Sequence, residues 1–194
     1  MQVPLFRPQT EWIPPEEFPD LNNYSEIAID LETKDPNLNK SMGSGSIIGH
    51  GDVVGVAVAV KDWHAYYPFA HEGGGNMDRK MVLKWLQKVL HTPAIKIFHN
   101  AMYDVCWLRH LGLTIRGRIV DTMIASALVD ENQLKYDLSS CSRRYVGQGK
   151  DENALYAAAK EWGVDAKAEM YKLPALYVGA CAEKDAELTL KLWL

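Results

Sequence analysis

An apolar strand that ends in two acidic residues constrains the fold of this chain more than any other feature of its sequence. Residues 26–31 are rich in β-branched and apolar side chains, and Asp30 and Glu32 stand two positions apart at the end of this stretch. Alternate residues of a strand face the same side, so both carboxylates point at one place. Two like charges there raise each other's pKa unless a cation intervenes. Divalent ions that prefer oxygen ligands, such as Mg2+ or Mn2+, usually neutralise such pairs of carboxylates in proteins.

Two carboxylates further along the chain, Asp104 and Asp185, are candidates for the same place. Asp104 follows Asn100 by four positions at the start of a predicted helix, so the two side chains share a helix face. Asp185 lies in the last predicted helix beside apolar residues, where a carboxylate needs a partner or a metal. Structural explanations stay open for both: Asn100 can cap its helix, with Asp104 at the positive end of the dipole, and Asp185 can belong to a solvated charge run.

The composition is typical of a cytoplasmic globular protein with one domain. The chain has 194 residues, of which 47% are hydrophobic and 24% are charged, and this length buries a full core. The net charge of −4 argues against extensive electrostatic binding to a nucleic-acid backbone, but not against binding a few nucleotides at a strand end. The apolar run at 53–60 is too short to span a bilayer, and the N-terminus lacks the pattern of a secretory signal. Three cysteines without a CxxC pair suggest neither a disulfide framework nor a zinc site.

The order of the predicted elements favours an α/β fold with a mixed sheet. Strand patterns come first and helical periodicity later, with one strand–helix–strand stretch between them, so helices should cover the faces of the sheet. Residues 1–25 are expected to form an extended lead-in and residues 35–52 a Gly-rich surface loop. Asp121 is interpreted as the N-cap of the helix that follows it rather than as a metal ligand. We expect strands at 26–31, 53–60, 63–69, 94–98 and 117–120, helices at 78–90, 100–111 and 122–129, helical segments from 137 with breaks at 147–149 and 163, and a final helix at 174–194.

Three motifs occur in the order found in a known group of nucleases. Asp-Leu-Glu-Thr at 30–33, His-Asn-x-x-x-Asp at 99–104 and a helical aspartate at position 185 resemble the three exonuclease motifs of the DEDD 3'–5' exonucleases. More closely, residues 24–194 resemble the proofreading domain of family A DNA polymerases, above all the phage versions. The resemblance implies a ribonuclease H-like fold, a mixed β-sheet flanked by α-helices, as a 3'–5' exonuclease domain at 26–194.

The resemblance also implies a two-metal phosphodiesterase site that binds two Mg2+ or Mn2+ ions. Asp30, Glu32 and Asp185 would hold the tightly bound ion. Asp30 would bridge to a second ion, which Asp104 would hold largely through water. In such sites one ion generates hydroxide from a bound water and the other stabilises the leaving 3' oxygen, about 3.5–4 Å away. The residues implied to contact the substrate are Asn100 and Tyr103 at the 3'-terminal nucleotide, Leu31 and Thr33 at its base and sugar, and Arg144 at a phosphate.

One position departs from the pattern of the group. The third motif normally has Tyr or His four residues before its aspartate, where it bonds the attacking water, and this chain has Cys181 there. A thiol is a weaker and shorter donor than a phenol, and nearby carboxylates suppress its ionisation. Three explanations stay open: Glu32 and the metals suffice and the cysteine only slows the reaction, Tyr177 one turn earlier takes the place of the usual tyrosine, or the domain has weak activity. The first is favoured because metal activation does most of the work on the water.

We therefore expect a metal-dependent exonuclease that acts on single-stranded DNA 3' ends or frayed primer termini and releases nucleoside monophosphates. It would be the proofreading domain of a family A polymerase, with a polymerase domain beyond Leu194, in the host cytoplasm if phage-encoded and without a membrane partner. A free-standing exonuclease of the RNase D or RNase T type and a catalytically weak domain that binds strand ends are the alternatives. The choice between DNA and RNA, the preferred metal and the oligomeric state stay open at this point.

Overall fold

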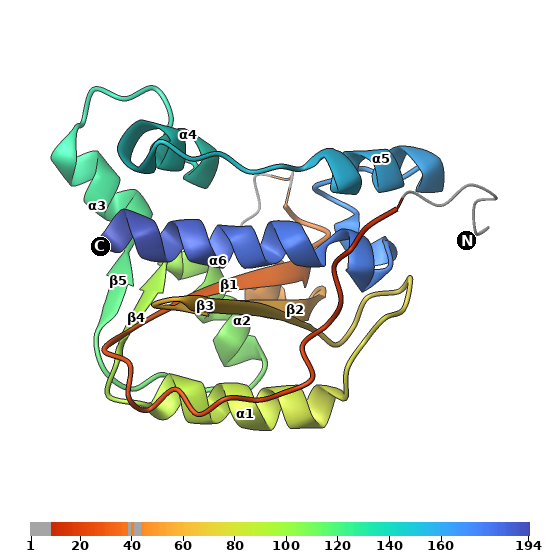
Figure 1. The fold of residues 1–194 in the computed structure, drawn as a ribbon, viewed down its shortest axis with the longest axis horizontal. Helices are drawn as coiled ribbons and strands as arrows, with labels where there is room; N and C mark the ends of the chain where they lie inside the picture. Colours follow the sequence, from red (N-terminus) through yellow and green to blue (C-terminus); the bar gives the residue numbers. More distant parts are fainter. Residues whose placement is uncertain (1–8, 39, 41–43) are drawn as a thin grey trace.

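A five-stranded mixed sheet forms the centre of the computed structural model, which describes residues 9–38, 40 and 44–194 (Figure 1). The strand order is β3–β2–β1–β4–β5. β2 pairs antiparallel with β1 and with β3, while β4 pairs parallel with β1 and with β5. The strands are β1 (Glu26–Lys34), β2 (Asp52–Val60), β3 (Trp63–Pro68), β4 (Ile95–Phe98) and β5 (Ile119–Asp121). The predicted mixed α/β sheet, with its hairpin of β2 and β3, is confirmed.

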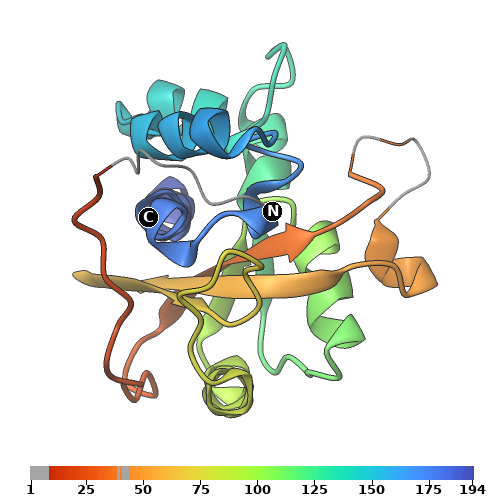
Figure 2. The same ribbon diagram turned by 90° about the vertical axis from the view of Figure 1, so that its right-hand side faces the viewer.

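Helices cover both faces of the sheet (Figures 1 and 2). α1 and α2 pack on one face and α6 on the other, while α4 and α5 lie on the outer side of α6. The helices are α1 (Arg79–His91), α2 (Ala101–His110), α3 (Thr122–Val129), α4 (Leu138–Cys141), α5 (Asn153–Trp162) and α6 (Gly179–Trp193), with short helical turns η1 (Gly45–Ile48), η2 (Ser142–Val146), η3 (Met170–Lys172) and η4 (Ala175–Tyr177). Among the described residues, no helix is long and apolar enough to cross a membrane.

The alternation of side chains along β1 decides which face of the sheet receives the acidic residues. Ile29 and Leu31 are buried in the core that the sheet shares with α1 and α2. Ala28 is buried on the opposite face, against α6. Because successive strand residues point to opposite faces, Asp30 and Glu32 lie on the α6 side with Ala28. The acidic end of β1 is therefore turned toward the last helix of the chain.

Alanines are prominent in the core between the sheet and α6, beside larger side chains such as Tyr66 and Leu190. Its buried members include Ala28, Ala57 and Ala59 from the strands and Ala182 and Ala186 from the helix. Because protein interiors are close-packed, small side chains on both surfaces let the helix backbone approach the sheet closely. This approach brings Asp185, the neighbour of Ala186, toward the acidic end of β1.

The lead-in, of which residues 9–25 are described, is extended as expected and packs against the domain along its length. Trp12 Nε1 donates a hydrogen bond to Glu183 Oε1 of α6 at 2.9 Å. Further along, Phe18 packs on Trp85 of α1, with ring centroids 5.8 Å apart. The segment thus joins the two layers of helices. Residues 1–8 of the lead-in and residues 39 and 41–43 of the predicted 35–52 loop lie outside the described residues.

The final helix begins later than the sequence predicts. The pattern predicts a helix over 174–194, but α6 starts at Gly179 and is preceded by the separate turn η4. Tyr177 and Val178 donate their N–H groups three residues back, to Pro174 and Ala175, so the chain forms a 3-10 turn before the regular helix. The other predicted helices and strands are found within a few residues of their expected limits.

Candidate metal centre

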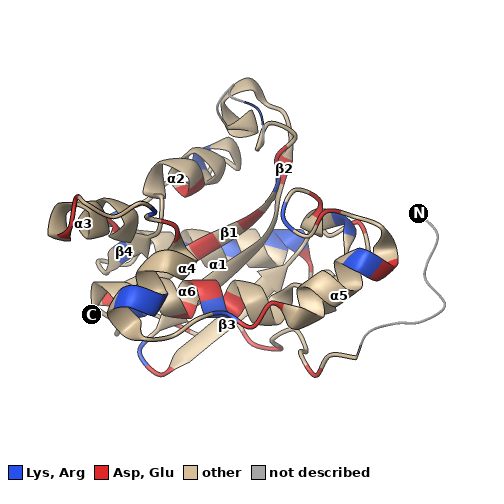
Figure 3. Cartoon of the chain, turned by 90° about the horizontal axis from the view of Figure 1, so that it is seen from above, with Lys and Arg blue, Asp and Glu red and all other residues tan. Residues whose placement is uncertain are grey.

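Three carboxylates from two elements converge at the end of β1. One oxygen each from Asp30 and Glu32 of β1 and from Asp185 of α6 lies within 4.8 Å of the others. Figure 3 shows acidic residues of β1 and of α6 meeting in this region. Gly55 of β2 is the register partner of Glu32, and a β-carbon there would lie 2.1 Å from Tyr66 Oη. The glycine therefore makes room for the Tyr66 ring beneath the acidic end of the strand.

Asp104 reaches the same region from the first turn of α2. Its side chain is buried, and its Oδ1 accepts a hydrogen bond from the backbone N–H of Leu31 at 3.2 Å. All four predicted carboxylates line a single cavity of about 300 Å3, which Leu31 and Tyr103 also line. Asp104 is not among the three residues whose oxygens lie within 4.8 Å of one another. It stands beside that group of three rather than inside it.

Burial and mutual repulsion raise the pKa of the carboxyl groups in this cavity. For Asp30 burial is the largest cause, followed by the charges of Asp185, Glu32 and Asp104. Burial and the charge of Asp185 raise the pKa of Glu32 to about 7. Burial also raises the pKa of Asp104 and of Asp185. The positive charge of Lys150 opposes these shifts at Asp30, Glu32 and Asp185, so the cavity favours a cation.

The oxygen atoms at this place suit a divalent cation. Asp185 Oδ1 is buried and has no hydrogen-bond partner among the described residues. An unpartnered buried carboxylate oxygen is costly, and here it lies next to two further carboxylates on β1. Hard oxygen donors of this kind favour Mg2+ or Mn2+ over softer metals. The donor set therefore fits the ions that the resemblance implies.

Lys150 contributes a positive charge that the motifs do not reveal. It lies in the loop between η2 and α5, and its Nζ is 2.7 Å from Asp185 Oδ2 and 4.0 Å from Glu152 Oε1. Burial lowers the pKa of Lys150, but the charge of Asp185 and the hydrogen bond to it raise the pKa by more, so the ammonium form is favoured. Gly147 and Gly149 precede it in the sequence. A single lysine in a Gly-rich loop is no signal on its own, because only the fold brings this loop to α6.

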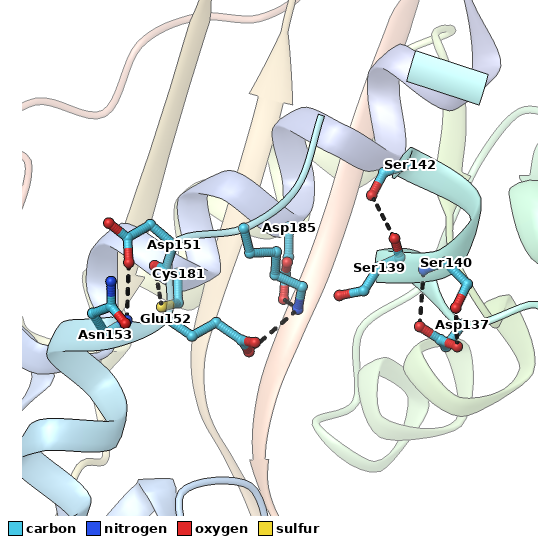
Figure 4. Close-up of polar contacts among 10 residues, drawn as sticks. Asp137, Ser139, Ser140, Ser142, Asp151, Glu152, Asn153, Cys181 and Asp185 are labelled. Carbon is cyan, nitrogen blue, oxygen red and sulfur yellow. Dashed lines mark hydrogen bonds and ion pairs between the residues drawn. The ribbon is translucent and has the colours of Figure 1, made fainter. Parts of the chain in front are cut away.

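Cys181 is buried in the wall of the cavity and contacts the Lys150 loop. Its Sγ donates to the backbone oxygen of Asp151 at 3.6 Å, and Figure 4 shows Cys181 beside Asp151 and Glu152. Burial and the charges of Asp185, Glu152 and Glu32 raise the pKa of the thiol to about 12. The thiol is therefore protonated at neutral pH, and it serves as a donor to this loop.

Tyr177 does not share a helix face with Cys181 and Asp185, because α6 begins at Gly179. Its ring packs against Trp162 of α5, with centroids 5.2 Å apart, in an apolar cluster to which Cys181 also belongs. Tyr177 is not among the described residues that line the cavity.

Of the residues predicted to contact substrate, Leu31 and Tyr103 line the cavity. The Tyr103 hydroxyl is 2.7 Å from Thr33 Oγ1 and donates to Asp35 at 3.2 Å, which fixes the ring at the cavity wall. Arg144 lies elsewhere: its guanidinium is half-exposed and pairs with Asp130 at 2.8 Å. The structure thus brings Tyr103 and Leu31 to the carboxylates but not Arg144.

Asp121 caps two helices at once. Its carboxylate accepts hydrogen bonds from Met123 and Ile124 at the start of α3, which confirms the predicted N-cap. It also accepts from the backbone N–H groups of Asn100 and Ala101 at the start of α2. The interpretation of Asn100 as a side-chain cap is wrong, because Asn100 adopts φ 73° and its side chain makes no cap bond. The carboxylate from the neighbouring parallel strand takes that role.

The sequence matches the family of 3'–5' exonuclease domains from family A DNA polymerases over residues 11–194. A DNA-directed DNA polymerase of Pseudomonas phage M6 is 34% identical over 200 aligned residues, which cover 99% of this chain and 30% of the relative. DNA polymerase I of Pseudomonas aeruginosa is 32% identical over 86% of this chain and 17% of the relative. The chain therefore spans less than a third of the length of these curated relatives.

Solved structures show the same fold at low sequence identity. NrnC of Brucella melitensis with bound Mg2+ superposes with a TM-score of 0.56 at 17% identity, over 90% of this chain and 72% of that chain. RNase D of Escherichia coli gives a TM-score of 0.56 at 15% identity, over 89% of this chain and 38% of that chain. These neighbours confirm the predicted ribonuclease H-like exonuclease fold.

Proposed function

This chain belongs to the family of 3'–5' exonuclease domains of family A DNA polymerases, and from that premise we propose that it removes nucleotides from DNA 3' ends as a proofreading domain. The observation that supports this proposal most strongly is the convergence of Asp30, Glu32 and Asp185, whose oxygens lie within 4.8 Å of one another. Asp104 completes the set in the same cavity. The products would be nucleoside monophosphates, released one at a time.

The four carboxylates would hold two divalent ions. Asp30, Glu32 and Asp185 would bind one ion, for which Asp185 Oδ1 offers a buried, unpartnered oxygen. Asp104, beside this group, would serve the second ion together with Asp30. When bound, such ions supply an activated water and stabilise the charge of the leaving oxygen.

The chain's own side chains would bind and orient the end of the strand. A cavity of about 300 Å3 is at the lower end of the range for small-molecule sites, which suits one terminal nucleotide rather than a duplex. Tyr103 and Leu31 give the cavity an aromatic and an apolar wall, and stacking on such walls accepts any base. Because a paired base must first be unstacked at a cost, a frayed 3' end is preferred.

Cys181 would help to shape this site without acting as a base. Its thiol is protonated at neutral pH and already donates to Asp151 O. In the proposed reaction the deprotonation of the water is therefore left to the ions and Glu32, which supports the explanation that the metals and Glu32 suffice.

The relatives of this chain are polymerases more than three times as long as the matched segment. We infer that a polymerase domain works with this exonuclease and delivers a mispaired primer end to it. RNA is the alternative substrate, since RNase D shares the fold.

The test is a degradation assay on the 194-residue chain. A 5'-labelled single-stranded DNA and an RNA of the same sequence are incubated with Mg2+ or Mn2+. We expect a ladder that shortens from the 3' end of the DNA and is lost in Asp30→Ala. Glu161→Gln, at an exposed position of α5, is the matched control and should keep full activity. Degradation of the RNA alone would reassign the substrate, and no degradation with either metal would refute the nuclease proposal.

A further inference from the structure

We propose that Lys150 is a positioning residue of this centre, which holds one oxygen of Asp185 so that the other is presented to the metal. The inference deepens the proposed function and depends on it. It starts from the two oxygens of a single carboxylate. Asp185 Oδ2 is 2.7 Å from Lys150 Nζ, while Oδ1 is buried and has no partner among the described residues. One oxygen is thus occupied and the other is left for a ligand.

The ion pair fixes the rotation of the Asp185 side chain. A carboxylate at a helix surface can turn about its terminal torsion, which is broad and roughly two-fold. A charge-assisted hydrogen bond to one oxygen selects one of these orientations. Partners of this kind behind a metal ligand orient the ligand and tune its affinity for the ion.

The loop of Lys150 is itself held against α6. Cys181, one helical turn before Asp185, donates its Sγ to the backbone oxygen of Asp151 at 3.6 Å. Glu152 Oε1 lies 4.0 Å from Lys150 Nζ on the other side. The Lys150 side chain is only 15% exposed, so a long and flexible side chain has been ordered at a cost in entropy. The contact of Asp151 with Cys181 of α6 thus holds the loop where Lys150 reaches Asp185.

A lysine beside a metal ligand can have two opposite effects. If it orients the ligand, its loss weakens metal binding, by about 10–100-fold for residues of this kind. If it instead occupies the place of the ion, its loss removes a competing charge and strengthens metal binding. The sign of the change in metal affinity therefore decides between orientation and competition.

The experiment measures Mn2+ binding without substrate. The concentration of free Mn2+ is obtained from its electron paramagnetic resonance signal. Lys150→Met keeps the length of the side chain without a donor, and Lys150→Arg keeps donor and charge. We expect the Met variant to bind Mn2+ about 10–100-fold more weakly and the Arg variant to fall between it and the wild type. Lys160→Met, at an exposed position of α5, should bind like the wild type. Circular dichroism in EDTA shows whether each variant is folded, and Lys150→Gln replaces the Met variant if that one is not.

Each result has a distinct meaning. Equal or tighter Mn2+ binding by folded Lys150→Met would overturn the inference while leaving the proposed nuclease intact. Failure of the wild type itself to bind Mn2+ would refute the proposed function. In the activity assay, the Met variant should lose kcat at low Mn2+ and recover at high Mn2+, with KM for DNA unchanged. A raised KM with unchanged Mn2+ affinity would assign Lys150 to the substrate phosphate instead.

Discussion

The indole ring of Trp12 lies over Gly179, the residue at which α6 begins. A β-carbon at position 179 would lie 2.1 Å from Trp12 Cε2, so the two residues fit only because one of them has no side chain. The same indole donates to Glu183 one turn further along the helix. The lead-in therefore holds the start of the helix that carries Asp185.

Replacing this glycine should destabilise the protein through Trp12. Gly179→Ala gains about 0.5–1 kcal/mol of helix propensity, but it overpacks the ring at a cost of about 1–3 kcal/mol. We expect a net loss of roughly 1 kcal/mol in the free energy of unfolding, measured with urea. In a Trp12→Ala background the same change should be neutral or stabilising. Equal effects in both backgrounds would show that the ring does not constrain this position.

The double cap at Asp121 predicts a change in stability without a change in metal binding. Asp121→Ala removes one cap from α2 and one from α3, and each is worth about 1 kcal/mol, so the free energy of unfolding should fall by roughly 2 kcal/mol. Mn2+ affinity should stay at the wild-type value in the folded variant. Asp104→Asn is the contrasting case, with weaker Mn2+ binding. A loss of Mn2+ affinity in Asp121→Ala would contradict the interpretation of this residue as a cap.

The metal-free protein should lose stability as the pH rises. The pKa of Glu32 is raised from 4.5 to about 7 on folding, so between these values the folded state binds more protons than the unfolded state. The contribution of Glu32 to the free energy of unfolding therefore falls as the pH rises from 4.5 to about 7. Below pH 4.5 the carboxyl is protonated in both states, and its burial carries no cost of ionisation. Asp30, Asp104 and Asp185 are shifted in the same direction.

Urea unfolding in EDTA at pH 5 and pH 8 measures this effect. Glu32→Gln, which cannot ionise, should lose less stability than the wild type between the two pH values. This comparison separates Glu32 from carboxyls elsewhere, such as Glu187, whose pKa is lowered by nearby lysines. Mn2+ added at pH 8 should restore stability to the wild type, because the ion binds the deprotonated carboxylates. If the wild type and Glu32→Gln lose the same stability between the two pH values, ionisation of Glu32 does not cause the loss.

Cys181 is expected to act through the loop that it contacts. Cys181→Ala removes the donor to Asp151 O and should weaken Mn2+ binding in the same direction as Lys150→Met, by a smaller factor. Cys181→Tyr places a large ring at a buried position and must displace that loop, so the exonuclease rate should fall. A clear gain in rate for Cys181→Tyr would show instead that the cysteine limits the positioning of the attacking water.

The sequence predicts the sheet and its hairpin because these depend on periodicity, while the meeting of Asp104 and Asp185 with the carboxylates of β1 is implied by the resemblance of the three motifs. Asp30 and Glu32 share a face by strand alternation, and Val53 to Val60 forms a buried strand that its apolar run indicates. The sequence misses features that depend on tertiary contacts. Lys150 reaches Asp185 across 35 residues, and nothing local in its loop shows that approach.

Tertiary contacts also bear on two other residues that the sequence singles out. Asn100 has the residue type of a helix cap, but a carboxylate 21 residues away occupies the N–H groups and leaves Asn100 in a left-handed conformation. The resemblance implies that Arg144 contacts a phosphate, and in the structure its guanidinium pairs with Asp130. Its assignment to the substrate stays a prediction.

Asp30 and Asp185 belong to the first strand and the last helix of the sheet domain, and this has a consequence for the order of folding. Contacts between distant parts of a chain form late, because the intervening segment must first be ordered. Asp185 therefore joins Asp30 and Glu32 only when α6 packs against the alanines of the sheet. Without α6 in place, the group keeps only the two carboxylates of β1, so the centre depends on the packing of the last helix.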